Sequence, residues 1–254
     1  MSAAPIPSQR QMVSSVQIPL PSGRSMKAVL AVPSDALATG GWPAVIVLYE
    51  VFGMTPEMIE VAERFARNRY VALVPDLFSA GPRLACMVRA MVESSRGRPG
   101  GTTARIEAAR LWLSGRPEVD RKRLGVIGFC MGGGVALAYA TTRPDGVGAV
   151  SVNYGQVPRD LVALRRACPI VASYGGRDLV YGRQASRLSK ALATFGVEND
   201  VKVYAEAGHS FLTDGHHPVG RLVFFPMRLG YHRPAADDAW QRIFSFFDRH
   251  VAGR

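Results

Sequence analysis

One cysteine of this sequence lies in a pattern that could make its sulfur a nucleophile. Cys130 stands between Gly128 and Gly132 in the stretch GFCMGGG, after an apolar run and before a helical pattern. A G-x-C-x-G turn between a strand and a helix strains its central residue and lifts that side chain above the sheet. The flanking residues must be small because strand and helix approach closely there. We therefore predict that Cys130 is a nucleophile and that the Met131 amide stabilises an oxyanion.

The glycine-rich stretch around Cys130 is also compatible with a structural role or with different chemistry. A buried cysteine in a glycine-rich turn would give the same pattern. A nucleotide-binding loop is disfavoured, because the stretch has neither the G-x-G-x-x-G register nor a Walker lysine. The three cysteines, Cys86, Cys130 and Cys168, form no C-x-x-C pair and no metal-binding spacing. Free thiols, and an N-terminus without an apolar signal segment, favour a cytoplasmic protein.

A nucleophilic thiol needs a histidine base, and His209 is the best placed of the five histidines. In the stretch YAEAGHSF it directly follows the last predicted strand, at its carboxyl end, whereas the others lie in loops or on the last helix. Neutral imidazole can accept a thiol proton near pH 7. His216 and His217 could suggest a metal site with His209, but no nearby thiolate completes it. We expect neither a metal nor a cofactor.

The base in turn needs an acid that orients it. In this arrangement the chain order is nucleophile, acid, histidine, so the acid must lie between Cys130 and His209. Asp178, in SYGGRDLV, follows an apolar strand through a glycine turn. Its alternative role is to cap the helix that follows. The competing acids in this interval are Asp145, Asp160, Asp200 and Glu198.

Glu50 ends the apolar run PAVIVLYE, where a carboxylate would be desolvated unless it faces a site. Facing a thiolate, it would disfavour ionisation of the sulfur by like-charge repulsion. We expect it to keep Cys130 protonated until substrate arrives. The Val51 amide follows the same strand and is the expected second oxyanion donor, beside that of Met131.

The elements that must position these residues alternate between strand and helix. This alternation predicts the α/β class, with a mostly parallel, doubly wound sheet flanked by helices and active-site residues outside the carboxyl ends of its strands. We expect one domain over residues 13–254 behind a disordered lead-in at 1–12. The predicted strands are 13–20, 26–32, 43–49, 70–76, 123–129, 146–155, 168–175 and the start of 199–211. The predicted helices are 55–68, 84–95, 103–114, 132–142, 183–196 and 236–251.

The formal net charge of +11 raises nucleic-acid binding as a rival function. Much of the excess lies in the arginine-rich segment 83–123. Its only aromatic residue is Trp112, so it offers no stacking platform, and a solvated basic surface fits it better. No apolar stretch reaches the roughly 18 residues needed to span a bilayer. We therefore expect a small-molecule substrate and neither a nucleic acid nor a membrane as partner.

Together these residues resemble the dienelactone hydrolase (carboxymethylenebutenolidase) family of α/β-hydrolases. The matching pieces are YEVFG, VPDLF, GFCMGG, GGRD and AGHSF, in that order, over residues 49–211. The resemblance implies an α/β-hydrolase fold and a Cys130–His209–Asp178 triad. It also implies that Glu50 contacts the resting thiol and swings away when a lactone or small ester binds. A thioester then forms, and water releases the acid.

Two positions depart from that family. Ala80 and Thr213 stand where relatives acting on dienelactone carry arginines that hold the substrate carboxylate. Arg83 and Arg221 are the nearest basic residues and are out of register, so a bidentate carboxylate clamp is not expected. Thioester, amide or carbon–carbon hydrolysis on the same triad, or ligand binding without catalysis, remain alternatives, and the chain could be a monomer or a homodimer. The candidates for substrate contact are Phe52, Arg83 and Phe211.

Overall fold

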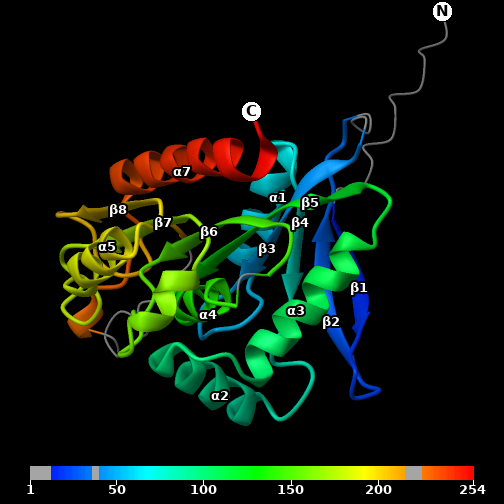
Figure 1. Cartoon of the computed structure of the whole chain (residues 1–254), viewed down its shortest axis with the longest axis horizontal. Coiled ribbons are helices and arrows are strands. Elements are labelled where there is room, and N and C mark those ends of the chain that lie inside the picture. Colours follow the sequence, from blue (N-terminus) through cyan, green and yellow to red (C-terminus); the bar gives the residue numbers. More distant parts are fainter. Residues whose placement is uncertain (1–12, 36–39, 143, 215–224) are drawn as a thin grey trace, which may run out of the picture.

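The computed structural model describes residues 13–35, 40–142, 144–214 and 225–254. Eight strands in these residues join one sheet in the order β1-β2-β4-β3-β5-β6-β7-β8 (Figure 1). β1 and β2 form an antiparallel hairpin, β2 pairs antiparallel with β4, and all other neighbours are parallel. Outside the described residues lie the expected lead-in at 1–12 and three residues named above, which are His216, His217 and Arg221. The strands are β1 (Val13–Pro19), β2 (Ser25–Ala31), β3 (Trp42–Leu48), β4 (Val71–Pro75), β5 (Val119–Phe129), β6 (Val147–Asn153), β7 (Ile170–Gly175) and β8 (Asn199–Tyr204).

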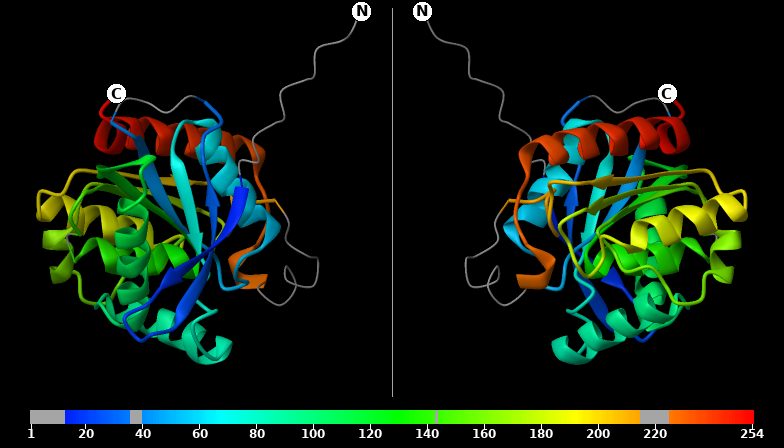
Figure 2. Two further views of the ribbon diagram at one scale, coloured as in Figure 1. Left: turned by 90° about the vertical axis from the view of Figure 1, so that its right-hand side faces the viewer. Right: turned by 90° about the vertical axis from the view of Figure 1, so that its left-hand side faces the viewer.

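Helices cover both faces of the sheet, which confirms the predicted fold class. Figure 2 shows α1 and α7 on one face and α3, α4 and α5 on the other, with α2 further out against α3 and α4. β3 and β4 are buried along their whole length because both of their faces are covered, as their unbroken apolar runs predict. The helices are α1 (Pro56–Arg67), α2 (Arg83–Arg96), α3 (Gly101–Ser114), α4 (Met131–Ala140), α5 (Gln184–Thr194) and α7 (Arg233–Phe247), which continues into a π-helical turn (Asp248–Ala252).

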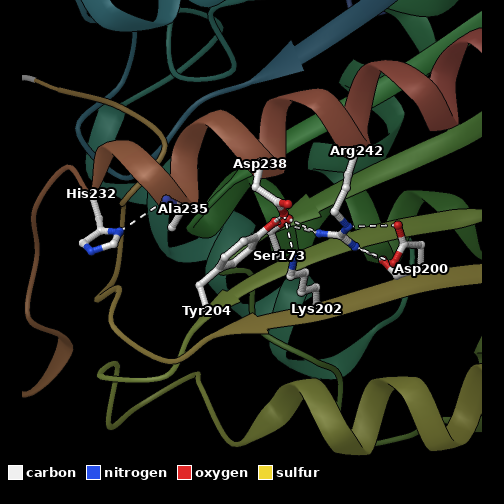
Figure 3. Close-up of polar contacts among 8 residues, drawn as sticks. All are labelled: Ser173, Asp200, Lys202, Tyr204, His232, Ala235, Asp238 and Arg242. Atoms are coloured by element: carbon white, nitrogen blue, oxygen red, sulfur yellow. Dashed lines mark hydrogen bonds and ion pairs between the residues drawn. The ribbon is translucent and has the colours of Figure 1, made fainter.

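α7 begins three residues earlier than the apolar spacing predicts, and His232 explains the difference. Its Nδ1 accepts a hydrogen bond of 3.3 Å from the Ala235 amide, so it caps the helix rather than lying in a loop (Figure 3). Inside the helix, Trp240 and Phe247 pack against Phe65 of α1, with ring centroids 6.1 and 5.9 Å apart. This aromatic contact joins the two helices over one face of the sheet.

A polar network ties α7 to the edge of the sheet beside β7 and β8 (Figure 3). Arg242 of α7 binds the Asp200 carboxylate at 3.0 Å through Nε and 2.6 Å through Nη2. It also donates to the Tyr204 hydroxyl at 3.0 Å, and that hydroxyl donates to Asp238 at 2.6 Å. Tyr204 packs against Phe211, so the network supports the segment that follows β8.

Arg242→Met is expected to lower the free energy of unfolding by about 1–3 kcal/mol, because it removes a bidentate pair with Asp200 and the hydrogen bond to the Tyr204 hydroxyl. The Arg242 side chain is only 15% exposed. Arg233→Met, on the same helix, is the matched control, because its side chain is 82% exposed and 3.7 Å from Asp237. That variant should change stability by less than about 0.5 kcal/mol. Urea unfolding followed by circular dichroism measures both; equal losses would contradict a specific role for the network.

Candidate active site

Cys130 lies between β5 and α4 in a strained conformation, with φ of 51° and ψ of −115°. Few residues other than glycine adopt this conformation, and such strain is typical of functional sites. The turn is tight: a Cβ added to Gly132 would lie 2.6 Å from the Tyr49 carbonyl oxygen, and one on Gly128 would collide with Gly132. The glycines are therefore required by the backbone, and the turn places the partly exposed thiol of Cys130 on the cavity.

Two residues from neighbouring elements line the same cavity as the thiol. Met131 is the first residue of α4, where amides precede the first intrahelical hydrogen bonds and carry the positive end of the helix dipole. Val51 follows β3, the strand next to β5, after a short loop. Both residues line a cavity of about 130 Å³ together with Cys130. The structure thus brings together the thiol and the two residues whose amides we expected from the sequence to stabilise an oxyanion.

His209 and Asp178 are in direct contact. The distance from His209 Nδ1 to Asp178 Oδ2 is 2.7 Å, and both side chains are almost completely buried. The other oxygen of Asp178 accepts hydrogen bonds from the amides of Val180 (2.9 Å) and Tyr181 (3.0 Å). These bonds fix the orientation of the carboxylate. Asp178 does not cap α5, because that helix is preceded by Arg183.

The competing acids are held elsewhere in the described chain, and none contacts His209. Asp178 directly follows β7 at its carboxyl end, whereas Asp145 and Glu198 precede strands, Asp200 lies inside β8 and Asp160 lies seven residues beyond β6. Asp200 binds Arg242, Asp160 accepts from the Val162 amide, Glu198 contacts His250, and the Asp145 carbonyl accepts from Arg110.

The electrostatics of His209 suit a thiol partner. Burial lowers the pKa of the imidazole, but the negative charge of a Cys130 thiolate and the hydrogen-bonded Asp178 carboxylate raise that pKa to about 10. His209 therefore keeps its proton next to an ionised sulfur. The rings of Tyr154 and Tyr181 enclose the imidazole, with centroids 4.8 and 5.3 Å away. The two tyrosine rings thus shield from water an imidazole that lines the same cavity as the Cys130 thiol.

This shift predicts the alkaline limit of any reaction that uses the His209 proton. A raised pKa means that the imidazolium persists below about pH 10 and is lost as the pH rises through that value. An ordinary histidine would lose its proton above about pH 6.5. We therefore expect kcat/KM for an alkyl ester to stay level between about pH 7 and 9 and to fall near pH 10, because the alkoxide leaving group needs that proton. Titration of the released acid, corrected for spontaneous hydrolysis, measures the profile. A fall in kcat/KM near pH 7 would contradict the raised pKa of His209.

Glu50 lies between two cavities. It is 4% exposed and lines the cavity that contains Cys130. It also lines a second cavity of about 90 Å³ together with Thr213. The fully buried Tyr154 lies against the same carboxylate: burial raises the pKa of its hydroxyl well above the ordinary value, and the charge of Glu50 raises it further, whereas a contact with Thr213 lowers it. Tyr154 is therefore neutral and can act as a hydrogen-bond donor at this end of the site.

The structure separates the three candidates for substrate contact. Phe52 lines the cavity and is 40% exposed. Arg83 does not line it, because its Nη2 donates to the Phe52 carbonyl oxygen at 2.7 Å, so it supports the loop after β3. Phe211 is fully buried and packs against Tyr154 and Tyr204, on the core side of the histidine segment. Of the three, only Phe52 can touch a ligand in the cavity.

Several residues of the site were not predicted from the sequence. Tyr154 lies behind the cavity against His209 and could have been found, because it directly follows β6 at the carboxyl edge of the sheet. Tyr181 could have been found as a neighbour of Asp178. The others come from α2, from the loop after β6, from the position after His209 or from the segment before α7, and they carry no local signal. They are Met91, Ser94, Gln156, Ser210, Met227 and Leu229.

Known proteins resemble this chain in sequence and in fold. The sequence model of the dienelactone hydrolase family matches residues 26–251. A Yersinia pestis protein assigned as a carboxymethylenebutenolidase is 30% identical over 90% of this chain and 85% of its own length. The carboxymethylenebutenolidase of Rhodococcus opacus is 26% identical over 84% of this chain and 83% of its own. A crystal structure assigned as a dienelactone hydrolase from Klebsiella pneumoniae superposes with a TM-score of 0.74 at 25% identity, covering 92% and 97% of the two chains. Within the described residues, no helix has the length and apolarity to cross a membrane.

Proposed function

Because the chain belongs to the dienelactone hydrolase family, we propose that it hydrolyses a small ester or lactone through a Cys130 nucleophile and a thioester intermediate. The observation that carries this proposal is the 2.7 Å contact between His209 and Asp178, on the same cavity as a thiol in a strained strand–helix turn. A binding protein would have no need of a strained thiol beside an oriented imidazole.

The reaction has two halves. In the first, His209 takes the proton of the Cys130 thiol, and the sulfur bonds to the carbonyl carbon. The electron pair of the carbon–oxygen double bond moves to the oxygen, which accepts from the Val51 and Met131 amides. The carbon–oxygen single bond then breaks, and His209 gives its proton to the departing alkoxide. In the second half, His209 takes a proton from water, whose oxygen attacks the thioester carbon. The sulfur departs as thiolate and the carboxylic acid is released. The proton on His209 then returns to the sulfur, which restores the resting thiol.

Glu50 would control when the sulfur ionises. Its buried carboxylate lies on the same cavity as Cys130, so a thiolate and a carboxylate would repel each other there. The second cavity beside Glu50 and Thr213 provides space into which the carboxylate can turn when substrate enters. The neutral Tyr154 hydroxyl can donate a hydrogen bond to the Glu50 carboxylate both before and after this turn. The thiolate then forms mainly when a substrate carbonyl is present to be attacked.

The cavity lining favours an uncharged acyl group. Within the described residues, no lysine or arginine lines it, and the one carboxylate on it is that of Glu50. An anionic substrate would therefore meet repulsion without a compensating pair. Apolar contacts come from Phe52, Met91, Met131, Met227 and Leu229.

Trapping the thioester tests this proposal. The protein is mixed with p-nitrophenyl acetate or butyrate, quenched in acid within the first turnover and digested for mass spectrometry. We expect an acyl mass on the peptide that contains Cys130, removable by hydroxylamine. Iodoacetamide treatment beforehand should abolish it. Acylation of a serine, or product release with no acylated Cys130 at any time, would rule out the thioester route.

A further inference from the structure

α2 exposes an apolar stripe to solvent. Leu84, Val88, Met91 and Val92 are 68%, 50%, 49% and 39% exposed. Spacings of three and four residues place them on one face of the helix. The opposite face is buried against α3 and α4, where Cys86 and Ala90 pack. α2 therefore has two apolar faces, and only one of them is used by the fold.

Arginines flank this stripe, and no exposed acid of α2 accompanies them. Arg83, Arg89 and Arg96 are exposed on α2, and Arg98 follows directly after it. The only acid of the helix, Glu93, is buried and accepts hydrogen bonds from the amides of Thr102 and Thr103. In the rest of the basic segment 83–123, other arginines are paired inside the fold: Arg110 with Glu107, Arg116 with Glu118 and Arg123 with Asp120.

The stripe reaches the mouth of the active-site cavity. Met91 belongs to both, since it is half exposed and lines the cavity. Leu179 and Val180 are also exposed, and they directly precede the cavity residue Tyr181. The Leu179 amide donates to the Pro226 carbonyl at 3.0 Å, which joins it to the segment that carries Met227. Exposed apolar side chains thus belong to, or directly adjoin, cavity residues from two separate segments of the chain.

We propose that this surface docks on an anionic phospholipid bilayer, with the cavity facing the lipid. A helix with an exposed apolar stripe and arginines beside it is the pattern of an interfacial helix, since the side chains enter the headgroup boundary while the guanidinium groups meet lipid phosphates. The charge of +11 adds attraction to such a surface. From the sequence we expected no membrane partner, because no apolar stretch is long enough to span a bilayer, but surface docking needs no such stretch.

The charges favour lipid over a second copy of the chain. A symmetric dimer through α2 places the same patch on both sides of the interface, so the arginines of one α2 would face those of the other. With the acid of α2 buried, nothing on the helix would compensate this repulsion. Docking itself does not depend on the proposed hydrolysis; if both hold, the ester reaches Cys130 from the lipid phase.

Co-sedimentation with vesicles tests the proposal. We expect the full chain to sediment with phosphatidylcholine vesicles that contain phosphatidylglycerol, and far less with phosphatidylcholine alone or in about 1 M salt. Leu84→Asp combined with Val88→Asp should lower partitioning at least about tenfold, because burying one such side chain contributes roughly that factor. Neither residue lines the cavity, so turnover of a soluble ester should not change.

Leu111→Asp is the matched control, because Leu111 is 58% exposed on α3, outside the stripe. It should partition like the wild type. Three results would overturn the docking proposal: no sedimentation of the wild type with anionic vesicles, equal partitioning of the double variant, or a doubled mass in light scattering that the double variant returns to a monomer. Absence of soluble-ester turnover in the wild type would instead count against the proposed hydrolysis.

Discussion

Replacing Cys130 by alanine is expected to lower kcat for ester hydrolysis by at least about 10⁴-fold. The sulfur forms the bond to the acyl carbon in the proposed reaction, and no other side chain occupies the strained position between β5 and α4. Alanine has the same backbone restrictions as cysteine at a φ of 51°, so the turn should keep its shape. Initial rates with p-nitrophenyl acetate measure the loss of kcat, and a thermal melt of the same sample shows whether the fold is kept.

Cys86→Ala and Cys168→Ala are the controls for this variant. Cys86 is buried and accepts a hydrogen bond from Arg105, and Cys168 lies before β7, far along the chain from the elbow. Both variants should keep kcat within about twofold, with any loss appearing in the melt. If Cys130→Ala kept more than about a tenth of the wild-type rate, the nucleophile would have to be another group and the thioester route would fail.

The order of elements was predictable because the central strands are buried on both faces and carry unbroken apolar runs. β3, β4 and β7 show this pattern clearly, and turn residues mark where they end. The start of α7 was not predictable from periodicity, since the cap is a histidine whose Nδ1 accepts the Ala235 amide. Helix ends depend on single capping bonds, which leave little trace in the apolar pattern.

The candidate site was predictable to the extent that it follows strands. Cys130, Asp178 and His209 each come soon after a strand, and parallel strands deliver such residues to one edge. Phe211 illustrates the limit: two residues beyond His209, its ring turns into the core beside Tyr204. Met91 lies on a helix that reaches the cavity only through packing on α4. Contacts of that kind depend on helix placement, which local sequence does not specify.

Asp178→Asn is expected to lower kcat by about 10³–10⁴-fold while leaving the fold intact, because it should force the wrong tautomer on His209. One oxygen of Asp178 accepts from the Val180 and Tyr181 amides. In the variant the amide oxygen must keep that place, since an NH₂ group there would oppose two donors. The NH₂ group then faces Nδ1 of His209, which must become the acceptor, and the proton moves to Nε2. A protonated Nε2 in a neutral ring cannot take the thiol proton.

The same substitution should also move the alkaline limit of the reaction. Asp178 is one of the groups that raise the pKa of His209 to about 10, and removing its charge lowers that pKa. We therefore expect the residual activity to fall at a lower pH than that of the wild type, which a loss of folded protein would not produce. Asp160→Asn is the matched control, because this exposed acid lies in the same interval of the chain and accepts only from a nearby loop amide. If Asp178→Asn kept activity within about tenfold of the wild type with an unchanged pH limit, His209 would not be the base, and the acid–histidine contact would be structural.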